Sequence, residues 1–105
     1  MKTSQNVINR IAVREYERAI AEMSKCDYSV KKLRSCTAEV ITTDNYYILR
    51  SYNTLVACIN RYTGLEADVL RKVYGYTSTS CQHIRKFFED YKVRLSYPAK
   101  RYQYR

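Results

Sequence analysis

The hydrophobic residues change their spacing along the chain, and this change constrains the fold more than any other feature. Between residues 4 and 24, apolar side chains recur every three or four positions, as on one face of a helix. From residue 37 to residue 60, β-branched and aromatic residues form short runs of strand length, with a turn signal at Asp44-Asn45. Helical spacing returns over residues 78–91. Segments of both periods in one short chain predict an α+β fold.

Each predicted helix has a candidate cap and one apolar face. Thr3 or Ser4 can cap the first helix, and Thr79 and Gln82 have the spacing of a capping box in the second. On the first helix, the spacing of Arg14 with Glu17 and of Arg18 with Glu22 predicts exposed ion pairs. The apolar faces comprise Ile8, Ala12, Tyr16, Ala19, Ile20 and Met23 in the first helix, and Cys81, Ile84, Phe87, Phe88 and Tyr91 in the second.

The strand-like runs predict a three- or four-stranded antiparallel β-meander with the C-terminal helix packed on one face. The number of strands depends on residues 61–75, for which two interpretations stay open. Leu65, Val69, Leu70 and Val73 could line one face of a helix. Alternatively, Gly64 could take a positive φ in a hairpin loop, which would make residues 65–70 a fourth strand.

The net positive charge is concentrated in two segments without a helix or strand pattern. The chain has 105 residues and 19 Lys and Arg against 10 Asp and Glu, a formal net charge of +9. Its length fits one domain, which we place at residues 1–91. Residues 25–36 are interpreted as a basic loop and residues 92–105 as a mobile, Tyr-rich basic tail. The charge therefore lies mainly in these two appendages.

Clustered cations favour a phosphate-rich partner, because each neutralised phosphate releases counterions. Tyrosines between the cations of the tail could stack on bases. Two other interpretations stay open, a solvated tail and a tail that docks on an acidic protein face. The candidate binding residues are Lys25, Lys31, Lys32 and Arg34 in the loop, and Lys92, Arg94, Lys100, Arg101, Tyr102, Tyr104 and Arg105 in the tail.

The sequence offers little material for catalysis or metal binding. His83 is the only histidine, and no nucleophile or carboxylate has a readable spacing to it, so we expect a structural role and no enzyme activity. No cofactor motif is present, and we expect no cofactor. Nine residues separate Cys26 from Cys36, more than in a usual zinc knuckle. We expect no metal site, although binding by these two cysteines stays open. No apolar run has the length of a membrane span.

Three motifs carry a resemblance to a known group of proteins. They are SYNTLVA at residues 51–57, YTG at 62–64 and YTSTSCQHI at 76–84. Together they resemble a family of small uncharacterised bacteriophage and mobile-element proteins with the pattern SYxTxVA, TG and YSxTTxxHI. The resemblance covers about residues 37–90. It implies a strand, a TG hairpin, a second strand and a helix, with Tyr76, Thr79 and His83 at signature positions in structural roles.

The resemblance also implies a function, because small phage proteins that are not enzymes commonly act by binding. We expect an inhibitor of a host defence nucleoprotein, of the anti-CRISPR type that blocks a CRISPR effector nuclease. Such a protein would work in the cytoplasm of the bacterial host cell, contact the nuclease, with direct contact to its RNA or DNA as a further option, and need no membrane. The alternative is a small DNA-binding transcriptional regulator. The identity of the target and the oligomeric state stay open.

Overall fold

One sheet of six strands organises the molecule. A computed structural model describes residues 4–75, 77–93 and 101–105. The strands lie side by side in chain order, with antiparallel pairing from β1 to β5 and parallel pairing between β5 and β6. The elements are α1 (Gln5–Lys25), β1 (Ser29–Lys32), β2 (Ala38–Thr42), β3 (Tyr46–Ser51), β4 (Thr54–Asn60), β5 (Glu66–Asp68), α2 (Leu70–Val73), α3 (Ser78–Tyr91) and β6 (Arg101–Gln103).

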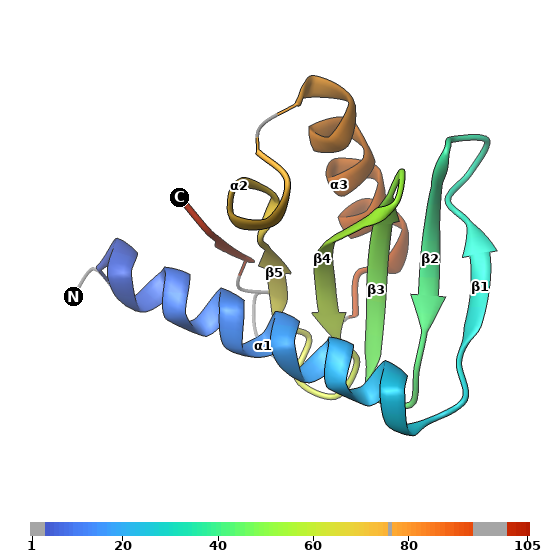
Figure 1. Cartoon of the computed structure of the whole chain (residues 1–105), viewed down its shortest axis with the longest axis horizontal. Helices are drawn as coiled ribbons and strands as arrows, with labels where there is room; N and C mark the ends of the chain where they lie inside the picture. The colour runs from blue at the N-terminus through green and yellow to red at the C-terminus, as the bar shows by residue number, and fades with distance from the viewer. Residues whose placement is uncertain (1–3, 76, 94–100) are drawn as a thin grey trace.

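The helices cover the two faces of the sheet, as Figure 1 shows, with α1 across one face and α3 on the other. Two buried clusters result, because alternate residues of the central strands point to opposite faces. On the α1 side, Ala12 and Ala19 pack with Ile41 and Ile48. On the α3 side, Ile84, Phe87 and Phe88 pack with Val40, Leu49, Ala57 and Ile59. The predicted α+β class and the N-terminal helix are confirmed.

The first helix forms where the spacing predicts it. Ser4 is its N-cap and accepts a hydrogen bond from the backbone N–H of Val7. Thr3, the other candidate, lies outside the described residues. The predicted ion pairs are wrong: none joins Arg14 to Glu17 or Arg18 to Glu22 among the interactions of residues 4–75. Glu22 instead accepts hydrogen bonds from Thr43 and Asn45.

Residues 61–75 contain both elements between which the sequence left a choice. Gly64 has a φ of +78° and donates its backbone N–H to the carbonyl of Asn60, which closes the hairpin. The strand that follows is short, and Asp68 accepts a hydrogen bond from the backbone N–H of Leu70 at the start of α2. The helical spacing thus belongs to the single turn of α2, and the hairpin interpretation holds for β5.

The second helix, α3, covers the predicted range, but its cap differs. The side chain of Thr77 accepts from the backbone N–H of Ser80, so the helix starts before the predicted capping box at Thr79 and Gln82. The chain does not end with this helix. A strand follows it, and the sheet is mixed rather than an antiparallel meander.

Two strands lie in the segments that were predicted to be irregular. The prediction of a basic loop over residues 25–36 is wrong for residues 29–32, which form β1 and pair with β2. The prediction of a mobile tail is wrong for residues 101–105. There β6 pairs with β5, and Tyr102 and Tyr104 pack against the buried cluster on the α1 side. These last residues therefore belong to the folded domain. Arg94 and Lys100 lie outside the described residues.

Candidate nucleic-acid interface

The outer face of α1 carries a row of cations, which we call the α1 stripe: Arg10, Arg14, Arg18 and Lys25. The three arginines follow one another at intervals of four residues, and Lys25 lies two turns further on the same face. All four are exposed, and the buried Ala12 and Ala19 lie on the opposite side of the helix. At 1.5 Å per residue, the stripe is about 22 Å long.

Internal partners do not neutralise the α1 stripe. Within the described parts of the chain, no ion pair or hydrogen bond involves any of its four side chains. Of the acids on α1, Glu15 and Glu22 bond to residues of the sheet side, and the exposed Glu17 offsets one of the four charges without forming an ion pair. The charge of the stripe is therefore available to an external anion.

Most carboxylates elsewhere are already engaged inside the molecule. The ion-paired acids are Glu39, Glu66, Glu89 and Asp90, and those that accept hydrogen bonds without an ion pair are Glu15, Glu22 and Asp68. Burial is the main cause of a raised pKa for Asp68. This use of the acids leaves cations to dominate the exposed surface.

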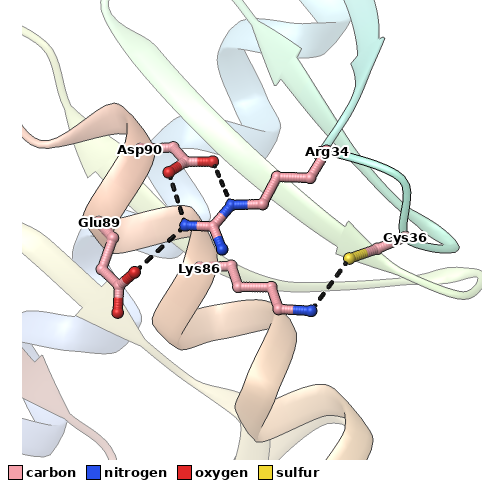
Figure 2. A network of polar contacts seen from close by, with 5 residues as sticks. All are labelled: Arg34, Cys36, Lys86, Glu89 and Asp90. Carbon is pink, nitrogen blue, oxygen red and sulfur yellow. Dashed lines mark hydrogen bonds and ion pairs between the residues drawn. The ribbon is translucent and has the colours of Figure 1, made fainter.

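A second basic region lies at the edge strand β1. Lys31 and Lys32 are exposed there, and they line an open cleft of about 500 Å³ with Leu33, Arg34, Asp90 and Tyr91. Arg34, which follows, is not free. Its guanidinium donates to both carboxylate oxygens of Asp90 at 2.8 Å and to Glu89 at 3.2 Å (Figure 2). The hydrogen bond from Arg34 lowers the pKa of Asp90.

The predicted residues of the C-terminal segment lie at the opposite edge of the sheet and serve the fold. Arg101 donates to Glu66 at 3.1 Å, and its guanidinium lies 4.4 Å from the centre of the Phe88 ring. Lys72 lies over the Tyr104 ring. The backbone of Arg105 exchanges two hydrogen bonds with the side chain of Asn9.

The predicted binding residues therefore do not form one surface. Lys25 lies on α1, Lys31 and Lys32 on β1, and Lys92 at the end of α3, while residues 101–105 lie on β6 and beyond. The sequence interpretation missed Arg10, Arg14 and Arg18. Their four-residue spacing is the available signal, but the sequence predicts ion pairs of Arg14 with Glu17 and of Arg18 with Glu22, and the structure forms neither.

A buried polar cluster joins β3 to α3. The Ser51 hydroxyl lies 2.9 Å from the Ser80 hydroxyl and 2.9 Å from Nδ1 of His83. Ser51 and Ser80 are fully buried and His83 is 4% exposed, so the hydroxyls have no access to a substrate. Burial, with a smaller contribution from Lys86, lowers the pKa of His83. The cluster connects α3 to the sheet through the hydrogen bond between His83 and Ser51.

The cysteines of the structure are separate thiols. Cys26, Cys36 and Cys81 are half-buried, and Cys58 is buried in the core. Within the described ranges, no group of three or more His, Cys, Asp and Glu side chains could hold a metal ion. None of the helices in those ranges has the length and apolar character needed to cross a membrane.

Comparison of the chain with protein-family models, curated proteins and solved structures finds no match.

Proposed function

We propose that this protein acts by binding, and that the α1 stripe contacts the phosphate backbone of a nucleic acid. The supporting observation is a row of four exposed cations without internal acid partners on one rigid helix. Each phosphate that such a row neutralises releases condensed counterions, and this release provides most of the affinity for nucleic acid. The stripe presents no loop or pocket that would read base edges, so it favours backbone contact over sequence readout.

We propose that the protein acts in the cell as an inhibitor of a host defence nucleoprotein, of the anti-CRISPR type that blocks a CRISPR effector nuclease. A nucleoprotein offers phosphates and a protein surface together. Two separate basic regions, on α1 and on β1, are suited to such a composite target. A small DNA-binding regulator remains the alternative, and it requires sequence-selective binding to duplex DNA.

Salt-dependent binding tests the role of the α1 stripe. We would titrate the full chain against a fluorescent duplex DNA and a single-stranded RNA over a range of salt concentrations. The variant R10Q/R14Q/R18Q should bind more weakly and reduce the slope of log K against log salt by about 2–3, since each lost phosphate contact contributes about 0.7–0.9. The matched control K72Q/R85Q/K92Q removes the same charge from other exposed positions and should keep most of the slope.

The two outcomes separate stripe-specific binding from a general charge effect. Equal losses in the two triple variants would contradict a contact through α1. A cleavage assay with guide-loaded CRISPR effector nucleases then tests whether the protein inhibits such a nuclease. Inhibition by the wild type and its loss in R10Q/R14Q/R18Q would support an inhibitor. Selective binding to one duplex sequence without inhibition would favour the regulator.

A further inference from the structure

β1 is an edge strand with main-chain groups that face away from the sheet. Of the strands that the structure describes, only β2 pairs with β1. The backbone N–H of Leu33 donates to the carbonyl of Ala38, so Leu33 faces β2. Because alternate residues of an antiparallel strand face the same neighbour, Ser29 and Lys31 face β2, while Val30 and Lys32 present their N–H and C=O groups outward. The edge can therefore accept another strand.

The side chains of β1 provide positive charge on both faces of this edge. Val30 and Lys32 lie opposite Ile41 and Glu39 on the α1 side, and Lys31 lies opposite Val40 on the α3 side. Val30 is 43% exposed, so an apolar contact is also available. An added strand would meet Val30 and Lys32 on the α1 side and Lys31 on the α3 side.

The wall of the neighbouring cleft is held in place. Arg34 joins the turn after β1 to the end of α3 through Asp90 and Glu89 (Figure 2). The cleft that Lys31 and Lys32 line is bounded by this ion-pair network. A side chain of an incoming strand could enter the cleft without displacing a helix.

We propose that β1 binds an extended acidic segment of a partner protein, which adds a strand to the sheet. The main-chain groups of Val30 and Lys32 would form the ladder, and carboxylates of the partner would pair with Lys31 and Lys32. Lysines on an edge oppose pairing with a second copy, because they bring like charges into one short ladder. The inference uses no residue of the α1 stripe, so it does not depend on the proposed nucleic-acid contact through α1.

Amide NMR of the full chain tests this inference with a defined probe. The probe is a short capped peptide of alternating Glu and Val, and the matched control peptide alternates Lys and Val. The acidic peptide should shift the amide resonances of residues 29–32 and slow hydrogen exchange at Val30 and Lys32. The basic peptide should do neither. Absence of these effects with the acidic peptide would overturn the proposal.

Two variants at one position separate strand addition from simple charge attraction. V30P removes an outward N–H without removing a lysine, and Pro is tolerated where that N–H faces solvent. V30A is the matched control that keeps the N–H. The acidic peptide should bind V30P about threefold to tenfold more weakly than V30A, the effect of one lost hydrogen bond. Equal affinities would refute strand addition.

Further variants keep the outcomes interpretable. K31E/K32E should lose binding of the acidic peptide, because both pairing cations become acids. R10Q/R14Q/R18Q should keep it, whether or not this variant still binds nucleic acid. If V30P does not fold, as judged by its thermal unfolding, hydrogen exchange in the wild-type chain decides between the alternatives.

Discussion

Single buried polar residues connect the helices to the sheet. Glu15 of α1 accepts hydrogen bonds from Tyr46 of β3, at 2.7 Å, and from Asn60 of β4, at 3.2 Å. On the other face, Ser51 of β3 bonds both Ser80 and His83 of α3. Each contact satisfies groups that would otherwise be buried without a partner, a state that costs more than the bond itself contributes.

The stability of the protein should depend on the protonation of His83. Burial lowers the pKa of this imidazole below the unfolded value of about 6.5, so the unfolded chain binds the proton more readily. The contribution of His83 to stability is therefore complete above about pH 6.5 and is lost as the pH falls through the folded pKa. Urea unfolding of the wild type should show a free energy of unfolding that falls as the pH is lowered below about 6.5.

Two variants complete the His83 test. H83N keeps a short polar side chain near Ser51 but does not titrate, and its stability should vary less over the same pH range. S51A removes the shared hydroxyl and should lower the free energy of unfolding by about 1–3 kcal/mol. An H83N variant with the full pH dependence of the wild type would assign that dependence to other groups.

At the scale of elements, the sequence predicted those whose residue pattern comes from burial in the core. The helical spacing of Ile84, Phe87 and Phe88 predicted α3, because only one face of that helix is buried. The runs over 37–60 predicted β2, β3 and β4 for a different reason, because both faces of these strands are buried and each gives a short run of apolar and β-branched residues. These strands lie in the middle of the sheet and are rich in buried apolar residues.

The edge strands could not be predicted in the same way. All four residues of β1 are exposed, so burial imposes no alternation on Ser29–Lys32. β6 has only three residues, and its parallel partner β5 is distant in sequence. The ionic contact of Arg101 with Glu66 depends on that pairing, which no local spacing reveals.

Removal of β6 should destabilise the domain. A chain that ends at residue 100 loses the pairing with β5, the packing of Tyr102 and Tyr104, and the ion pair that compensates the buried Glu66. We expect the free energy of unfolding in urea to fall by about 2–4 kcal/mol. R105A keeps the backbone bonds to Asn9 and should change it by less than about 0.5 kcal/mol. A truncated chain as stable as the wild type would show that β6 adds nothing to the fold.

At the scale of the whole molecule, folding redistributes the charge that the composition reports. The sequence places most of the +9 surplus in two appendages, but Arg34 and Arg101 are paired with acids once the chain folds. The α1 stripe, whose helix has little net charge in sequence, keeps its cations exposed because Glu15 and Glu22 bond to residues of the sheet side, and the exposed Glu17 forms no ion pair with the stripe. Net charge by segment therefore could not locate the exposed cations, since this requires knowledge of which acids they meet.

The two basic surfaces should bind their ligands at the same time. The α1 stripe lies on a helix that packs over β3–β6, whereas the proposed protein site is the free edge of β1. At about 0.15 M salt, the screening length is about 8 Å, so an acidic peptide on β1 should perturb the stripe only weakly. Saturation with the Glu-Val peptide should change the duplex DNA affinity by less than about twofold in fluorescence anisotropy.

The same experiment at lower salt should show an effect of the peptide on DNA binding. At about 0.01 M the screening length grows to about 30 Å, comparable to the size of the molecule. The same peptide should then weaken DNA binding, because its carboxylates reduce the positive field that the whole protein presents. A DNA dissociation constant that rises in proportion to peptide concentration at 0.15 M would instead mean competition for one surface. That result would require α1 and β1 to be treated as a single polyanion site.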